Sequence, residues 1–241
     1  MVKGIDSFRG WFRGFESNYV IIGGTACDLL MGEAGEAFRA TRDIDMVLIV
    51  EALSAEIGAR IWEYVKAAGY EQRLKSSGTP EYYRFMKPKT PEYPAMIELF
   101  SRRIEGITLP PDATLTPLPI DDEVSSLSAI LLDDEYYDFL RVGATISDGI
   151  SILGAAHLIP FKAKAWLDLT ERKAKGSQVD SKNIRKHMND IVSLSALLSP
   201  DFNMFLPGAV AHDMARFLAA VDAPERFIRT AAVYMLPDIV R

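Results

Sequence analysis

The stretch FRATRDIDMVLIV, residues 38–50, constrains the fold of this chain more than any other. Its last five residues are apolar and indicate a buried strand, yet the strand begins with Asp43 and Asp45. A buried charge is costly unless an opposite charge or a metal ion compensates it. Because side chains alternate between the two faces of a strand, both carboxylates point the same way and Ile44 points the other way. The sequence therefore predicts carboxylates that converge on one or two cations.

A second apolar stretch, AMIELFS at residues 95–101, supplies a third carboxylate. Glu98 stands in the middle of this predicted strand, where an unpaired acid is expensive. Hard divalent cations such as Mg²⁺ or Mn²⁺ prefer oxygen ligands and keep room for phosphate oxygens and water. We therefore expect Asp43, Asp45 and Glu98 to be the metal ligands and the catalytic carboxylates. Taken singly, two aspartates at a strand start more often mark a surface loop edge or a cap, and Glu98 fits an exposed face equally well.

Before these acids comes VIIGGTA, residues 20–26, which predicts a strand, two glycines and the start of a helix. Glycine lets the backbone approach a ligand closely, and the first N–H groups of a helix favour an anion. We expect Gly23, Gly24 and Thr25 to form a cradle for phosphate. A phosphate cradle followed by paired carboxylates on the next strand suits phosphoryl or nucleotidyl transfer. A pair of glycines after a strand is, on its own, more often a plain turn.

The order of predicted elements indicates an α+β fold with a mixed sheet flanked by helices, followed by a C-terminal helical domain. We place the boundary near residue 150, with a first domain at 1–150 and a helical domain at 151–241. For residues 127–132 and 136–142 the sequence leaves two alternatives, a hairpin or a strand–helix pair. The other expected strands are 19–22, 44–50, 70–75, 82–87 and 95–101, and the expected helices are 5–16, 25–32, 53–68, 154–175, 180–198, 208–221 and 224–235.

Composition narrows the class of protein. The sequence shows no run of 18 uncharged apolar residues, so no membrane span is expected, and its first residues lack a signal peptide's apolar core. The single cysteine, Cys27, excludes an internal disulfide framework, and a cytoplasmic location is the default expectation. The net charge is −6, but residues 162–187 carry five more basic than acidic residues, which leaves −11 on the remainder. This basic segment suits a polyanion or a triphosphate, although a solvated pair of helices explains it equally simply.

The pattern GG…DID…IEL resembles the nucleotidyltransferase superfamily that includes DNA polymerase β. Within it, FRATRDIDMVL is similar to the R-x-T-x-D-I-D form of the AbiEii-type toxin nucleotidyltransferases, which matches Arg39 and Thr41 as well as both aspartates. The stretch HLIPFKAKAWLDLTER…IRKHMNDIVSLSAL resembles that family's helical region. The resemblance runs from about residue 18 to 198. It departs from the family in having His187 where Asp is common, Glu as the third acid, and eighteen residues between Gly24 and Asp43.

The resemblance implies a nucleotidyltransferase that moves a nucleoside monophosphate from an NTP to a hydroxyl acceptor. It implies that Arg39, Thr41 and Lys162 contact the nucleotide, with Arg172 nearby and Asp190 as the final acid. An exposed helix lysine and an Asp190–Lys186 ion pair are the simpler alternatives for that region. By the same resemblance the acceptor is RNA, such as the tRNA 3′ end, and the protein is a toxin with a separate antitoxin protein. Two alternatives stay open: a nucleotidyltransferase for small antibiotic-type molecules, and a non-catalytic module that keeps the fold.

Overall fold

The chain divides into two compact units. The computed structural model describes residues 2–72, 82–101, 130–131, 133–199 and 201–221. The first unit comprises Met1–Pro119 with Ala144–Leu153, and the second comprises Ile120–Gly143 with Gly154–Arg241. The chain therefore passes between the units three times, whereas the sequence suggested one boundary near residue 150. The reason is a short β-hairpin, described below, which returns to the sheet of the first unit.

A seven-stranded mixed sheet forms the centre of the first unit, with the strand order β3-β4-β5-β2-β1-β7-β6. Strand β2 runs parallel to β5 and antiparallel to β1, and β7 runs parallel to β1. The predicted mixed sheet is thereby confirmed. The strands are β1 (Tyr19–Ile22), β2 (Asp43–Leu48), β3 (Glu71–Gln72), β4 (Tyr82–Met86), β5 (Met96–Phe100), β6 (Ala144–Ser147) and β7 (Ile150–Leu153).

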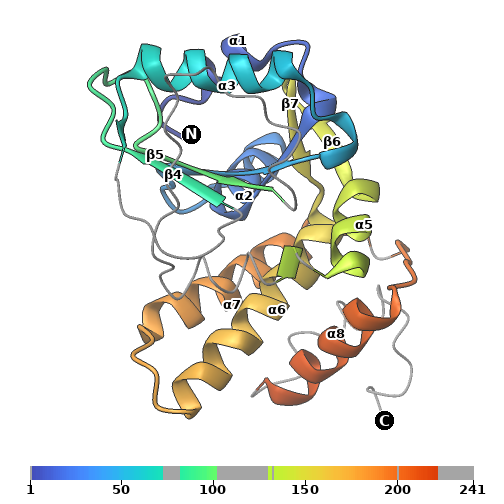
Figure 1. The fold of residues 1–241 in the computed structure, drawn as a ribbon. Helices are drawn as coiled ribbons and strands as arrows, with labels where there is room; N and C mark the ends of the chain where they lie inside the picture. Colours follow the sequence, from blue (N-terminus) through green and yellow to red (C-terminus); the bar gives the residue numbers. More distant parts are fainter. Residues whose placement is uncertain (1, 73–81, 102–129, 132, 200, 222–241) are drawn as a thin grey trace. The chain divides into compact units, whose positions relative to one another are not determined.

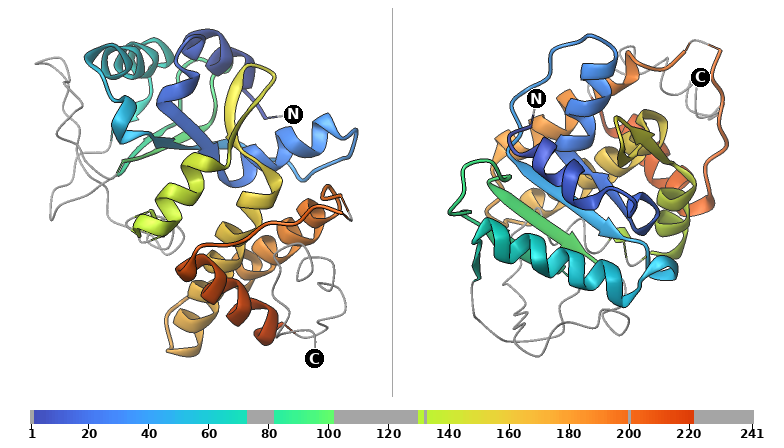
Figure 2. Two further views of the ribbon diagram at one scale, coloured as in Figure 1. Left: turned by 90° about the vertical axis from the view of Figure 1, so that its right-hand side faces the viewer. Right: turned by 90° about the horizontal axis from the view of Figure 1, so that it is seen from above.

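The described part of the first unit has three α-helices: α1 (Ile5–Phe12), α2 (Gly23–Glu33) and α3 (Ala55–Ala68). Helices α1 and α3 lie side by side over one face of the sheet (Figures 1 and 2). Phe8 and Phe12 of α1 stack at 4.4 Å and make edge contacts with Tyr19 of β1 and Tyr64 of α3. These buried rings hold both helices on the sheet, because aromatic side chains bury large apolar areas.

Local signals explain where α3 begins and ends. The Ser54 hydroxyl accepts a hydrogen bond from the backbone N–H of Ile57 and so satisfies one of the free donors at the helix start. Gly69 ends the helix in the left-handed conformation with φ of 64°, as glycine readily does. The helix predicted over residues 53–68 is thereby confirmed, with its start two residues later.

The β6–β7 hairpin was not predicted from the sequence, although it carries a recognisable signal. Its strands are joined by Asp148 and Gly149, which both have positive φ, at 45° and 73°. A two-residue Asp-Gly connection of this kind matches the twist of the two strands it joins. Residues 144–153 therefore form an antiparallel pair that extends the sheet beyond β1, with Ser147 opposite Ile150.

The second unit is helical in its described part. Its helices are α5 (Asp134–Val142), α6 (Ala155–Ala174), α7 (Ser181–Ser195) and α8 (Gly208–Ala220), so the predicted helical domain is confirmed. Helix α5 resolves the open assignment of residues 136–142, and the helix predicted over 224–235 lies outside the described residues. None of the described helices combines the length and apolar character that crossing a membrane requires.

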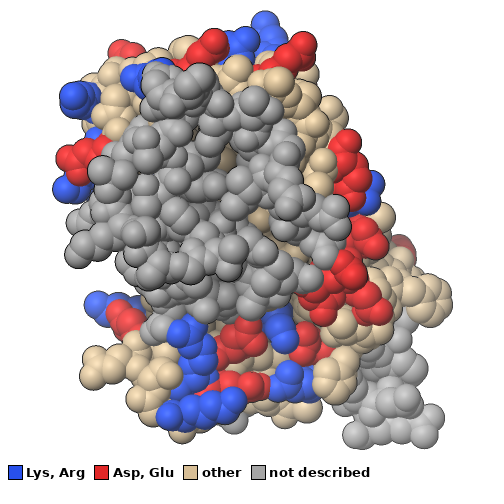
Figure 3. All heavy atoms as spheres, viewed as in Figure 1, with Lys and Arg blue, Asp and Glu red and all other residues tan. Residues whose placement is uncertain are grey.

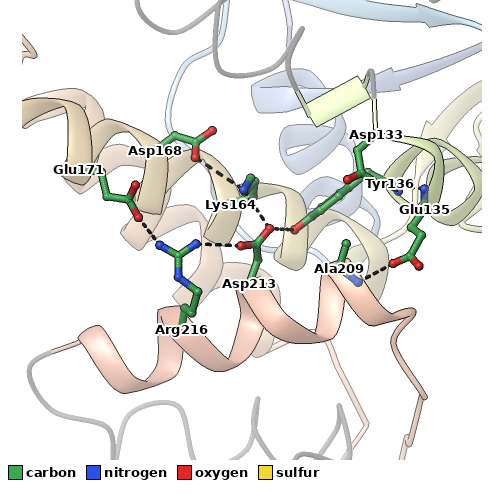
Figure 4. Close-up of polar contacts among 9 residues, drawn as sticks. All are labelled: Asp133, Glu135, Tyr136, Lys164, Asp168, Glu171, Ala209, Asp213 and Arg216. Atoms are coloured by element: carbon green, nitrogen blue, oxygen red, sulfur yellow. Dashed lines mark hydrogen bonds and ion pairs between the residues drawn. The ribbon is translucent and has the colours of Figure 1, made fainter.

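A polar network centred on Asp213 of α8 joins three helices of this unit (Figure 4). The buried Asp213 carboxylate accepts a hydrogen bond from the Tyr136 hydroxyl of α5 at 3.2 Å and pairs with Lys164 Nζ of α6 at 2.9 Å. Arg216, one turn further along α8, contacts Asp213 at 3.1 Å and also pairs with Glu171 of α6. The network therefore fixes α8 on α5 and α6.

We predict that Asp213→Ala destabilises the second unit by about 2–4 kcal/mol, because it leaves buried donors without their acceptor. The free energy of unfolding in urea, followed by circular dichroism, measures the loss. Asp138→Ala is the matched control: Asp138 is an exposed acid of α5, 3.6 Å from Arg141, and its loss should cost less than about 0.5 kcal/mol. Equal effects of the two substitutions would contradict the assigned role of Asp213.

Candidate active site

One transverse row of the sheet brings together three charged residues, Asp45, Glu98 and Arg84. Along this row Asp45 of β2 lies opposite Glu98 of β5, and Glu98 lies opposite Arg84 of β4. On the other side Asp45 lies opposite Ile22, the last residue of β1. Because residues in register on neighbouring strands share a face, Arg84, Glu98 and Asp45 project from the same side of the sheet. This is the side opposite to Tyr19 and the aromatic cluster, since Tyr19 lies an odd number of residues from Ile22.

Glu98 is buried between two neighbours that have opposite effects on its pKa. Burial and the adjacent Asp45 carboxylate both raise the pKa of Glu98 above its usual value, whereas Arg84 lowers it. Arg84 binds Oε1 of Glu98 twice, through Nε at 2.6 Å and Nη2 at 2.5 Å. Two short contacts from a guanidinium to one carboxylate oxygen are typical of a charged pair. We therefore take Glu98 as ionised when it is bound to Arg84. Sequence reasoning did not identify Arg84 as part of this row.

Gly23 brings the start of α2 against Asp45. A Cβ atom placed on Gly23 would lie 1.8 Å from Asp45 Oδ2, and the φ of Gly23 is +70°. Only glycine accommodates both the close approach and the left-handed backbone without strain. The predicted glycine turn and the predicted acid pair are thus in direct contact, as a phosphate cradle beside a cation site requires.

The segment before β2 folds back over Gly24. A Cβ atom on Gly24 would meet Thr41 Cγ2 at 2.8 Å and the Arg39 guanidinium at 3.1 Å, so both side chains lie over this glycine. The Thr41 hydroxyl oxygen is buried and makes no hydrogen bond within the described part of the chain. Thr25 differs from these residues, because its fully buried hydroxyl donates to the Asp43 carbonyl at 2.6 Å. Its hydroxyl therefore ties α2 to β2, which leaves the backbone as its means of contacting a phosphate.

Asp43 lies two residues before Asp45 on β2 and projects from the same face, opposite Met96 of β5. Within the residues that the structure describes, no three His, Cys, Asp or Glu side chains are grouped closely enough to hold a metal ion. The structure thus brings Asp45 and Glu98 together, and it places Asp43 two residues earlier on β2, on the same face of the sheet. The three acids offer the oxygen donors that a hard divalent cation prefers, and the Asp45–Glu98 contact places two of these acidic groups side by side.

In the second unit Lys162 of α6 pairs with Asp190 of α7, with 2.8 Å between Nζ and Oδ2. Both residues are buried, at 5% and 1% exposure, so Lys162 is not an exposed helix lysine. Arg172 follows Lys162 by ten residues on the same helix, which separates them by about 15 Å along the axis. The structure therefore joins Lys162 to Asp190 and leaves Arg172 at the far end of α6.

Comparison with known proteins supports the fold and little else. The chain is similar to the crystal structure of an antigenic nucleotidyltransferase-like protein from Paracoccidioides brasiliensis, with 15% identity, a TM-score of 0.50, and 95% of this chain and 91% of that chain covered. The chain has a nucleotidyltransferase-like fold. A second similar structure is the solution structure of the antibiotic-resistance factor ANT(2'')-Ia, with 11% identity, a TM-score of 0.38 and 80% and 86% coverage. No family model and no curated protein matches the sequence.

We predict that Gly23→Ala destabilises the first unit by about 2 kcal/mol or more, because the new methyl group collides with Asp45 and the φ of residue 23 is positive. Gly32→Ala is the matched control within α2, since Gly32 is exposed and has open space around it. That control should be neutral or stabilising by up to about 1 kcal/mol. Thermal unfolding of the three proteins measures both effects, and a Gly23→Ala protein as stable as wild type would exclude the close approach.

Proposed function

We propose that this chain transfers a nucleoside monophosphate from an NTP to a hydroxyl group of an acceptor, with release of pyrophosphate. The observation that carries the proposal is the contact of Asp45 with both Glu98 and the first glycine of α2. It places acidic oxygens beside a helix start that suits phosphate. The nucleotidyltransferase-like fold is consistent with this chemistry, although a shared fold alone does not establish an activity.

In this proposal Asp43, Asp45 and Glu98 hold Mg²⁺ or Mn²⁺. The cation, when bound, would neutralise charge on the phosphate oxygens at the reacting centre. The carboxylates also provide a proton acceptor for the attacking hydroxyl, because the reaction must remove that proton. Thr25 keeps β2 and the start of α2 together through its bond to the Asp43 carbonyl. The chain's own part is therefore to fix acidic oxygens and helix donors at one place.

The triphosphate would lie at Gly23 and Gly24, where the first backbone N–H groups of the helix suit an anion. Arg39 already contacts Gly24, and a guanidinium matches the geometry of phosphate oxygens. The buried Thr41 hydroxyl beside the same glycine has a donor to offer. These three groups support a phosphate site at the start of α2, in agreement with the R-x-T-x-D-I-D resemblance.

For Lys162 and Asp190 we propose a paired role. Asp190 orients Lys162 through the 2.8 Å ion pair, and the lysine serves as the phosphate contact of the helical unit. Arg172, almost three helical turns away, is assigned to the helix surface instead.

RNA is the acceptor that we favour, by the resemblance and by the basic segment at the α6–α7 turn. Its exposed basic residues are Lys173, Lys175, Lys182 and Arg185. On the face drawn in Figure 3, basic side chains over α6 and α7 are interleaved with acidic ones, whereas acidic side chains gather over α5. By the same resemblance, the biological role that we propose is that of a toxin with a separate antitoxin protein.

Two observations favour other functions and define what an experiment must separate. The charge of −11 outside residues 162–187 suits a cationic small molecule, such as an aminoglycoside, as acceptor. The pairing of Glu98 with Arg84 suits a non-catalytic module in which the acid is structural. Labelled-NTP transfer to an RNA pool and to an aminoglycoside panel distinguishes the three functions.

We predict that wild-type protein with Mg²⁺ labels RNA from one of the four NTPs, and that Asp45→Asn lowers the rate at least about a hundredfold. Removing a carboxylate that stabilises charge at the reacting centre costs several kcal/mol of transition-state stabilisation. Glu63→Gln is the control, because Glu63 is an exposed acid of α3 and should leave the rate unchanged. Labelling of the aminoglycosides alone would replace the RNA acceptor, and labelling of neither would favour the non-catalytic module.

We further predict that Thr41→Val raises the KM for the NTP about tenfold and leaves kcat nearly unchanged, because it removes one hydrogen bond to a charged phosphate. Steady-state kinetics with the labelled nucleotide measure both constants. Thr145→Val, an exposed position on β6, is the matched control. A loss confined to kcat would assign the Thr41 hydroxyl to the reaction itself and contradict a binding role.

A further inference from the structure

Arg84 is the one member of the charged row to which the proposed function gives no task. It lies on β4 directly opposite Glu98, and its guanidinium places Nε and Nη2 at 2.6 and 2.5 Å from the same oxygen, Oε1. Both side chains are largely buried, at 16% and 9% exposure. An ion pair of this kind is built into the sheet by register, so it does not depend on a mobile loop.

The position of Arg84 conflicts with binding of a cation by the same oxygen. Mg²⁺ binds a carboxylate oxygen at about 2.0–2.1 Å and requires near-ideal octahedral geometry around itself. With Arg84 already on Oε1, the ion and the guanidinium would be like charges only about 4 Å apart in a poorly hydrated place. The guanidinium therefore competes with the cation for Oε1.

The formal charges of these side chains also indicate that Arg84 and a cation compete for Glu98. Asp43, Asp45 and Glu98 carry three formal negative charges when ionised, and Arg84 reduces the total to two. The guanidinium thus compensates Glu98 in the chain without a cation, and this compensation is what a buried acid requires. The same compensation weakens the attraction of the site for a divalent ion.

We propose that Arg84 is an exchangeable counter-ion: it holds Glu98 in the cation-free protein and releases it when a divalent cation binds. This inference rests on the proposed function, because it takes Glu98 to be a cation ligand. It makes Arg84 a positioning residue that sets the affinity for the cation and does not itself contact the reacting atoms. A purely structural ion pair would leave that affinity unchanged.

The test is Mn²⁺ binding to the full-length, nucleotide-free protein, measured by isothermal titration calorimetry. Because Arg84→Gln removes the competitor for Glu98, it should tighten Mn²⁺ binding about tenfold. In the Glu98→Gln background the same substitution should change the affinity less than about twofold, since the residue competed for is gone. Arg84→Lys keeps the charge and should stay close to wild type. Arg60→Gln, at a half-exposed arginine of α3 outside this row, is the control for loss of an arginine.

Unchanged or weaker Mn²⁺ binding by Arg84→Gln would overturn the proposal, as would an equal gain in the Glu98→Gln background. If Arg84→Gln does not fold, the wild-type protein still provides a test by nuclear magnetic resonance. The Arg84 Nε–H signal should shift when Mg²⁺ is added, and it should not respond in Glu98→Gln. A signal that Mg²⁺ leaves unmoved in wild type would overturn the exchange. Absence of Mn²⁺ binding by wild type would instead remove the cation site of the proposed function, so the two failures are distinguishable.

Discussion

The register between β2 and β5 places Asp45 directly opposite Glu98, and the rest of the candidate site depends on that pairing. Two acidic groups in contact at a largely buried position require compensation. Arg84 supplies it from one side, through the next strand of the same row. Gly23 opens the other side, because the absence of a side chain lets the start of α2 reach the Asp45 carboxylate. A shift of β5 by one residue would turn Glu98 to the opposite face of the sheet, which carries Tyr19 and the aromatic cluster, and would separate Glu98 from Asp45 and Arg84.

The two units solve the problem of buried charge in the same way. In the helical unit Lys162 and Asp190 neutralise each other between α6 and α7, and Asp213 is satisfied by donors from three helices. In the sheet unit the pair is Arg84 with Glu98. These pairs differ in their surroundings: the Asp213 network joins helices and is explained by packing, whereas the Arg84–Glu98 pair lies beside Asp45, which in turn meets the glycine turn at Gly23. That difference is why we assign chemistry to the sheet row and stability to Asp213.

Periodicity and turn residues gave most of the elements, because β2, β5, α3 and α6 each carry an unmistakable apolar pattern with a clear start or stop. The β6–β7 hairpin was missed although Asp148-Gly149 marked its turn; the strands are only four residues long and precede a long helix. Arg84 was missed as a partner of Glu98 for a different reason. Strand β4 could be predicted, but the register of an antiparallel pair follows from the connection between its strands, and residues 87–95 carry no two-residue turn signal.

The sequence by itself determined which residues are candidates for the chemistry. Two aspartates one residue apart share a face of any strand, and two glycines before a helix allow close approach in any fold. Only the tertiary structure decided which of these groups meet. It placed Glu98 and Gly23 against Asp45, buried the Thr25 hydroxyl against the Asp43 carbonyl, and paired Lys162 with Asp190. The physical reason is the sequence separation of the interactions involved. Side-chain alternation and helix starts are local properties of the backbone. Strand order, register and helix packing instead depend on contacts between residues far apart in the chain.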